Sequence, residues 1–160
     1  MSDLRAVVAR GLANEYQELA RAVHKWVDPL STEQIWTNPN GFGNTIGHLL
    51  LHLTGNLSNY VGAEIARTGY VRNRPLEFSD DTRRPKEDVL RAFDEAVAMV
   101  LATIAAQSEQ DWCTPYTAAG HDAADRFSIV MHCATHLNHH LGQIIVLARA
   151  VAAQEAPARA

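Results

Sequence analysis

Four of the eight histidines of this 160-residue chain lie in one stretch, Met131 to Ile144. Histidine is a middling helix former, and its ring costs free energy when it is buried without polar partners. Packing alone therefore does not account for so many imidazoles in one segment. Because neutral imidazole nitrogens are common ligands of divalent metals, the stretch indicates metal chemistry.

His136 and His140 have the spacing that a shared metal ion needs. Side chains four residues apart on a helix lie on one face, with Cβ atoms about 5–6 Å apart, so both rings can reach one ion. At about 100° per residue, both lie at the edge of the apolar face, whereas His132 and His139 lie further from it. The pair predicts half of a metal site; the alternative is two core-edge histidines that only hydrogen-bond to their neighbours.

A third candidate ligand, His52, lies at the edge of the apolar face of an earlier predicted helix, over residues 45–68. Three neutral nitrogen ligands leave a coordination position open, as catalytic sites do, whereas structural zinc sites usually have four protein ligands. Imidazole suits several divalent metals, and zinc or nickel is the expected ion. The other polar residues near the ligands are expected to line the pocket or hydrogen-bond to the ligands: Asn56, Gln143, His48, His132 and His139.

Apolar residues recur at threes and fours in four segments, which predicts an all-α fold. The helices are expected near 3–27, 45–68, 85–107 and 125–153, and no stretch alternates like a strand. A four-helix bundle is the economical arrangement, as one domain over 1–153 with a disordered tail at 154–160.

Three connections join these predicted helices. The connection at 28–43 is rich in proline and glycine and has room for one short turn, and the connection at 108–125 is expected to be non-helical. The polar connection at 70–84 is longer than the usual two to about eight residues between adjacent antiparallel helices, which predicts a crossover between the second and third helices.

The amino-acid composition indicates which classes of partner this chain is expected to bind. The chain has 47% hydrophobic and 20% charged residues and a formal charge of −4, so no broad basic surface is expected and nucleic acid is not an expected partner. No apolar run of about 18 residues and no secretory leader is visible, so we expect no membrane association and a cytoplasmic location. Cys113 and Cys133 lack CxxC spacing and are expected to be reduced thiols.

Two motifs resemble those of the DinB-like superfamily: H-L-T-G-N from His52 to Asn56, and H-L-N-H-H-L-G-Q from His136 to Gln143. The stretch from Arg72 to Phe78 also resembles the crossover of one DinB-like subgroup. The resemblance covers essentially the whole chain. It implies a bundle that runs up-down-down-up, a metal-binding histidine triad and a homodimer.

The same resemblance implies a thiol-dependent enzyme, because the superfamily includes mycothiol-dependent maleylpyruvate isomerases and bacillithiol S-transferases. The metal would hold a low-molecular-weight thiol as its thiolate, which attacks a small-molecule electrophile. The family often has H-R-G-Q where this chain has Leu141 in place of the arginine. The chain therefore lacks one candidate anchor for a substrate carboxylate.

Two other functions remain open on the sequence. The first is a non-enzymatic metal-binding or stress-response protein. The second is a metal-dependent hydrolase, which needs a general base close to a metal-bound water. Glu64 is on the apolar face of the predicted helix over 45–68, but it is about three turns from His52, roughly 18 Å along the axis, which is too far for that role.

Overall fold

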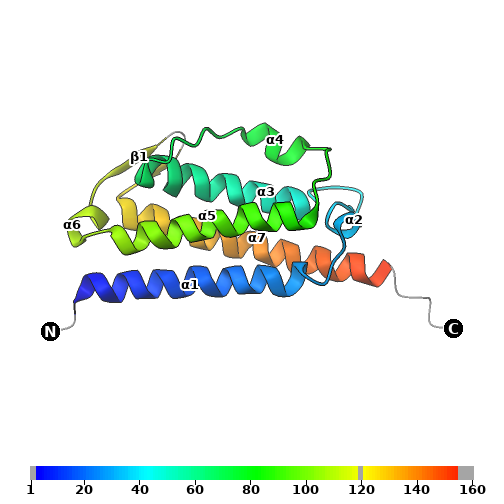
Figure 1. The fold of residues 1–160 in the computed structure, drawn as a ribbon, viewed down its shortest axis with the longest axis horizontal. Coiled ribbons are helices and arrows are strands. Elements are labelled where there is room, and N and C mark those ends of the chain that lie inside the picture. Colours follow the sequence, from blue (N-terminus) through cyan, green and yellow to red (C-terminus); the bar gives the residue numbers. More distant parts are fainter. Residues whose placement is uncertain (1–2, 119–120, 155–160) are drawn as a thin grey trace.

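Four long helical segments lie side by side in the computed structural model, which describes residues 3–118 and 121–154 (Figure 1). Helices α1 and α3 each pack against both α5 and α7. This mostly helical fold confirms the all-α class. The four segments are α1 (Leu4–Val27), α3 (Ile46–Leu57) continued by the π-helix η1 (Ser58–Ala66), α5 (Lys86–Ala106) and α7 (Arg126–Gln154).

The core lies between these segments because each long helix buries one apolar stripe. On α1 the stripe is Leu12, Tyr16, Leu19, Val23 and Val27, at the threes and fours that the α-helical period requires. The Tyr16 hydroxyl donates to the carbonyl of Val130 at 2.8 Å, which satisfies a buried polar group and joins α1 to α7.

Short elements interrupt the connections. Helix α2 (Thr32–Ile35) is the single short turn expected at 28–43, and α4 (Arg74–Ser79) lies within the connection at 70–84, which we call the crossover after its expected path. The expectation that 108–125 is non-helical is wrong, because this segment contains a helix, α6 (Glu109–Trp112). The segment also contains two paired strands of three residues each, β1 (Tyr116–Ala118) and β2 (His121–Ala123), which form a small antiparallel ribbon.

These short elements have local causes that a periodicity argument does not detect. Helix α6 begins with a capping box, in which the Ser108 side chain accepts from the Asp111 backbone and the Asp111 side chain accepts from the Ser108 backbone. The strands are three residues long, too short for an alternating pattern to stand out.

The second half of the helix expected over 45–68 is a π-helix rather than an α-helix. Its hydrogen bonds run to the fifth residue back, which widens each turn and changes the face that each side chain occupies. The segment ends at Arg67, which adopts the left-handed conformation with φ 58°. A pattern search based on 3.6 residues per turn does not distinguish this segment from an α-helix.

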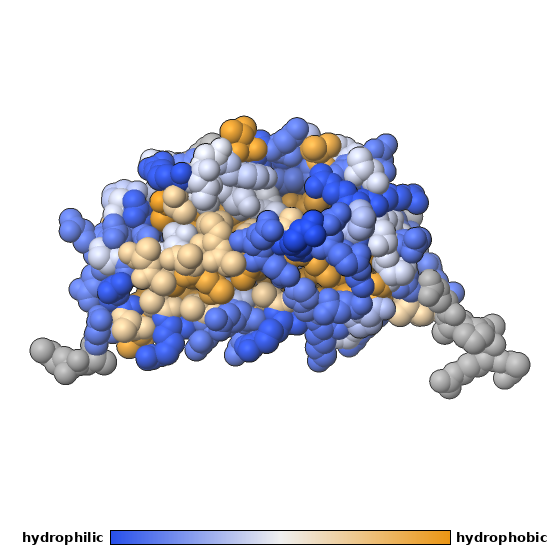
Figure 2. Space-filling model, in the orientation of Figure 1, coloured by the Kyte–Doolittle hydropathy of each residue, from blue (hydrophilic) through white to orange (hydrophobic). Residues whose placement is uncertain are grey.

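Among the described residues, no helix is both long and apolar enough to cross a membrane. On the face shown in Figure 2, apolar residues gather over α5 and its seam with α1, and hydrophilic side chains border them. Gln154, the first residue of the expected tail, is the last residue of α7, and residues 155–160 lie outside the described residues.

Candidate metal centre

His52 is positioned by the start of α3. The Thr45 side chain caps this helix by accepting from the backbone N–H of His48. Leu49 and Leu53 are buried in the core and fix the rotation of the helix about its axis. His52 is also buried, at 5% exposure, on the side that faces α7.

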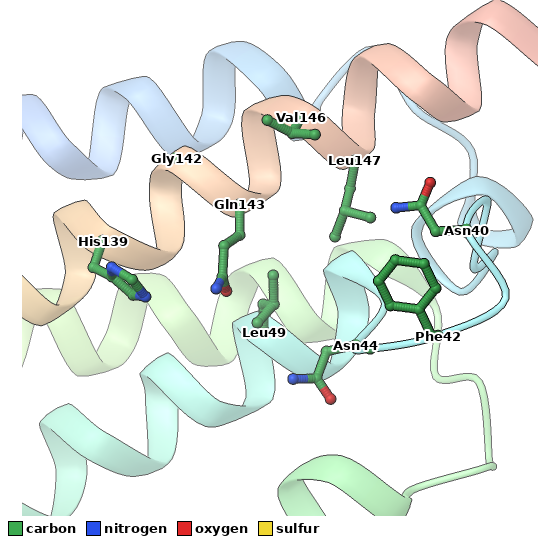
Figure 3. Close-up of a pocket in the computed structure, with 10 residues that line it drawn as sticks. Asn40, Phe42, Asn44, Leu49, His139, Gly142, Gln143, Val146 and Leu147 are labelled. Carbon is green, nitrogen blue, oxygen red and sulfur yellow. The ribbon is translucent and has the colours of Figure 1, made fainter.

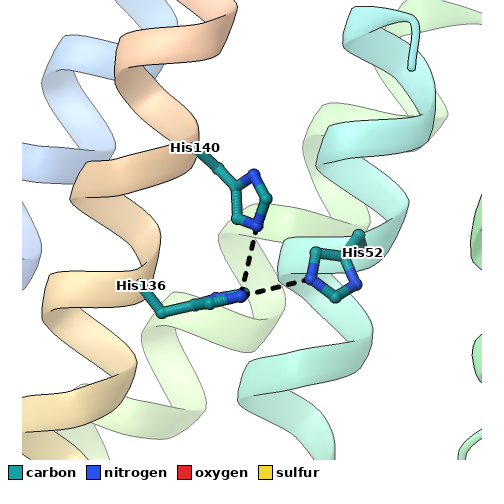
Figure 4. A group of neighbouring side chains, drawn as sticks. All are labelled: His52, His136 and His140. Atoms are coloured by element: carbon teal, nitrogen blue, oxygen red, sulfur yellow. Dashed lines mark hydrogen bonds between the residues drawn. The ribbon is translucent and has the colours of Figure 1, made fainter. Parts of the chain in front are cut away.

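His136 and His140 come from the middle of α7, where Leu137 and Leu141 anchor the helix in the core. Figure 4 shows both rings pointing across the gap between the helices toward His52. The three Nε2 atoms converge: His136 Nε2 lies 3.3 Å from His52 Nε2 and 3.2 Å from His140 Nε2.

Hydrogen bonds at the outer nitrogens fix the tautomers of two of these rings. His52 Nδ1 donates to Glu77 Oε2 at 2.8 Å, and His140 Nδ1 donates to Gln143 Oε1 at 2.8 Å. Each of these rings, when neutral, therefore directs the lone pair of Nε2 toward the centre of the cluster. Because these Nε2 atoms carry no proton, their lone pairs converge on one point and can bind a cation there.

The geometry and the charge state of the cluster both fit a metal ion. For metal–nitrogen bonds of about 2.0–2.1 Å, two nitrogens on a tetrahedral ion lie about 3.3 Å apart, which matches the separations seen here. Burial lowers the pKa of His136 to about 3, helped by the neighbouring His140, His52 and His132 rings, and burial also lowers the pKa of His140. Both rings are therefore neutral at physiological pH and available as ligands.

Glu77, in α4 of the crossover, is the partner of His52 that the sequence analysis missed. The Glu77 carboxylate is buried, and Arg72 donates to it from Nε to Oε1 at 2.7 Å and from a terminal nitrogen to Oε2 at 2.9 Å. Burial alone would raise the pKa of Glu77, but the hydrogen bonds from His52 and Arg72 and the charge of Arg72 lower it. The carboxylate is therefore ionised and makes His52 a stronger electron donor.

Gly55 makes room for this contact. A Cβ atom at position 55 would overlap the Glu77 carboxylate and would lie 3.5 Å from Arg72 Nε. The glycine one turn after His52 thus lets the crossover approach the helix closely enough for Glu77 to reach the imidazole. The available signal was the H-L-T-G-N motif itself, since a glycine inside a buried helix often marks a close approach.

A family model of the DinB superfamily matches residues 15–144, which is most of the chain and includes all three histidines. The chain belongs to the DinB superfamily. Comparison with curated proteins gave no match.

The structure of this DinB protein places the other candidate residues in different surroundings. Gln143 contacts His140, as described above. The His132 ring lies 6.2 Å from the His136 ring in a stacked arrangement, and His139 lines a pocket beside the cluster. Among the described residues, neither His132 nor His139 belongs to the group of possible metal ligands formed by His52, His136 and His140.

His48 and Asn56 lie on either side of His52 on α3. His48 Nε2 donates to the carbonyl of Asp80, so it holds the crossover rather than the cluster. Asn56 is buried, and its Oδ1 atom has no hydrogen-bond partner among the described residues, nor has His136 Nδ1. The expected contact of Asn56 with a ligand is therefore not among the hydrogen bonds of this structure.

Proposed function

We propose that this DinB protein binds one divalent metal ion, zinc or nickel, through Nε2 of His52, His136 and His140. The observation that carries the proposal is that His136 Nε2 lies at tetrahedral-edge spacing from Nε2 of both His52 and His140. One ligand atom of each ring lies within 4.8 Å of the others, and His52 and His140 are held in the ligand-competent tautomer. Three neutral ligands leave the site cationic and one position open, so the site suits an anionic fourth ligand.

We propose further that the open position serves the transfer of a low-molecular-weight thiol to an electrophile. A divalent metal supplies the charge that lowers the pKa of a bound thiol, so that the nucleophilic thiolate predominates at neutral pH. Glu77 and Gln143 orient the two imidazoles that they contact. Burial of His52 excludes water from one side of the cluster.

A hydrolase is less well supported, because Glu77, the carboxylate beside the cluster, already accepts hydrogen bonds at both oxygens and so is not free to act as a general base. Both oxygens of Glu77 accept hydrogen bonds, one from Arg72 alone and one from His52 and Arg72 together. Its pKa is also lowered, which makes it a weak base. A non-enzymatic metal-binding role requires the same three ligands and differs from the transferase in having no turnover.

The finer architecture is also part of this proposal. We propose that the long helices run up-down-down-up, with the segment between η1 and α5 as the crossover. We propose that the protein is a cytoplasmic homodimer that acts on a small-molecule substrate. Size-exclusion chromatography with light scattering measures the mass of the particle, and a monomer at micromolar concentration would contradict the homodimer.

The first experiment is metal analysis of protein purified without an affinity tag. The wild type is expected to carry about one divalent ion per chain, and the triple variant His52→Ala, His136→Ala, His140→Ala is expected to carry none. The matched control is His139→Ala, which removes a neighbouring imidazole that does not converge on the cluster and should leave the metal in place. Stoichiometric metal in the triple variant would overturn the proposal.

The second experiment separates the transferase from the non-enzymatic alternative. The metal-loaded protein is incubated with monochlorobimane and, in turn, glutathione, mycothiol or bacillithiol, and the fluorescent conjugate is measured. We expect one thiol to give turnover that His136→Ala lacks. Bound metal without turnover for any of the three thiols would support the non-enzymatic role instead.

A further inference from the structure

We propose that the groove beside the histidine cluster is a substrate subsite for neutral, mainly apolar molecules that carry one amide-like or carbonyl group. Its catalytic meaning depends on the metal-dependent function proposed above, because it names the class of molecule that this function would act on. Its binding chemistry can be measured without the metal.

The groove runs along the seam between α3 and α7 and is closed at one end by the loop that contains Phe42 (Figure 3). Its volume is about 470 Å³, within the range of small-molecule sites. Figure 3 shows Gln143 of α7 and Leu49 of α3 extending toward each other across the seam. Because Gln143 also contacts His140, one side chain connects the groove to the cluster.

The walls of the groove are apolar. Leu49 and Leu147 are buried and form part of the lining, and Phe42 and Val146 stand beside them although they are 77% and 63% exposed. Large apolar side chains usually leave water when a partner is available. Two such residues on the rim of one groove therefore favour a ligand with an apolar body, whose binding would remove them from water.

No permanently charged side chain of the described residues lines the groove. Its ten lining residues include no Asp, Glu, Lys or Arg, and three of its polar side chains are the amides of Asn40, Asn44 and Gln143. A carboxylate or phosphate would lose hydration here without gaining a cationic partner. Amides both donate and accept hydrogen bonds, so they match a neutral carbonyl or amide group instead.

Gly142 provides a way to fill the groove without disturbing the helix. It lies on α7 among the lining residues, and a Cβ atom there would meet nothing within 4 Å. A leucine at this position therefore has space to extend into the groove. Leucine is also a better helix former than glycine, so the variant should remain folded.

The test compares 2-naphthamide with 2-naphthoate, which have nearly the same shape but differ in charge. Binding is followed by NMR chemical-shift changes on the full chain after chelator treatment, so that no cation at the histidines can attract the carboxylate. We expect 2-naphthamide to bind with shifts at Phe42, Leu49 and Val146, and 2-naphthoate to bind at least about tenfold more weakly, the fold-change that 1.4 kcal/mol of lost pairing represents.

Two variants locate the binding. Gly142→Leu is expected to abolish it, whereas Gly11→Leu, the same change at an open glycine on α1 that lines a different groove, should leave it unchanged. Equal affinity for the two probes, no affinity for 2-naphthamide, or unchanged binding in Gly142→Leu would overturn the inference. These outcomes do not depend on metal binding, so a failure of the proposed function is detected separately by metal analysis.

Discussion

Glu77 accepts the hydrogen bond that orients the His52 imidazole. Its carboxylate holds His52 Nδ1 at 2.8 Å and is itself held by Arg72. Loss of the partner that orients a metal-bound imidazole typically costs 10–100-fold in metal affinity. We expect Glu77→Gln, which keeps the side-chain volume, to weaken zinc binding by about that factor in a competition titration with a chromophoric chelator.

The control for this variant is Asp80→Asn. Asp80 is a second buried carboxylate of the crossover, but its carboxylate accepts from Arg84 and Thr82, and only its backbone carbonyl contacts a histidine, His48. Asp80→Asn should therefore lower stability with little effect on zinc affinity. If both variants weakened zinc binding equally, general loosening of the crossover would explain the result and the specific role of Glu77 would be wrong.

A side chain at Gly55 should also weaken zinc binding by displacing Glu77 from His52. In Gly55→Ala the new methyl group overlaps the Glu77 carboxylate, so Glu77 must move away from His52. We expect zinc affinity to fall about as far as in Glu77→Gln, by roughly 10–100-fold. Gly11→Ala, at an open helical position, should instead stabilise the protein by up to about 1 kcal/mol. Unchanged zinc affinity in Gly55→Ala would show that Glu77 does not depend on the glycine.

Among the elements, α1 and α5 are joined by an exposed histidine clamp. His24 of α1 contacts Asp28 at 2.9 Å through Nδ1 and Asp94 of α5 at 2.8 Å through Nε2. Partial burial would lower the pKa of His24, but the hydrogen bonds and charges of Asp94 and Asp28 outweigh it, and the pKa is raised. The protonated ring donates to both carboxylates at once.

A raised pKa in the folded state gives this clamp a definite pH dependence. Its contribution is complete below the pKa of the unfolded chain, about 6.5, and is lost as pH rises through the higher folded value. We expect His24→Gln to lower the free energy of unfolding at pH 5.5, by up to about 1 kcal/mol for an exposed pair, and to have a smaller effect at pH 9. Urea denaturation at both pH values measures this.

The control is Lys25→Gln, which removes a charge from the adjacent exposed position. It reports the general effect of net charge on stability at each pH. A His24→Gln effect that was constant with pH, or that grew toward pH 9, would contradict the clamp.

The elements also show which parts of the molecule can be predicted from sequence. The long helices follow from apolar periodicity, and the positions of His136 and His140 on one face follow from i, i+4 spacing within one helix. The convergence of His52 on this pair could be anticipated because each histidine lies at the edge of an apolar face. Their role as metal ligands stays a prediction.

What could not be predicted depends on contacts between elements. The pairing of Glu77 with His52 requires the crossover to dock on α3, and the approach depends on the space at Gly55. No periodicity encodes where a fifteen-residue polar connection will lie. For the same reason periodicity does not predict the groove, which residues of the Phe42 loop line together with residues of α7.

For the molecule as a whole, metal binding should couple to folding. His52 and His136 are 84 residues apart in sequence, so an unfolded chain does not hold them together. At a free zinc concentration of about 100 times Kd, stability should rise by about 2.7 kcal/mol, which raises Tm by about 5–10 °C for a chain of this size. Differential scanning calorimetry before and after chelation measures the shift, and the triple histidine variant should show none. An equal shift in that variant would place the stabilising metal elsewhere.

The salt bridge between Glu77 and Arg72 also limits how easily a protease can cut the crossover after Arg72. Trypsin cleaves after arginine except before proline, and Arg74 and Arg84 each precede a proline, which leaves Arg72 and the exposed Arg83 as the arginines of this segment after which it can cut. Arg72 precedes asparagine, but its side chain is only 11% exposed because Glu77 holds it. The rate of cleavage after Arg72, compared with cleavage after Arg83, therefore reports how often the Glu77 carboxylate releases the guanidinium.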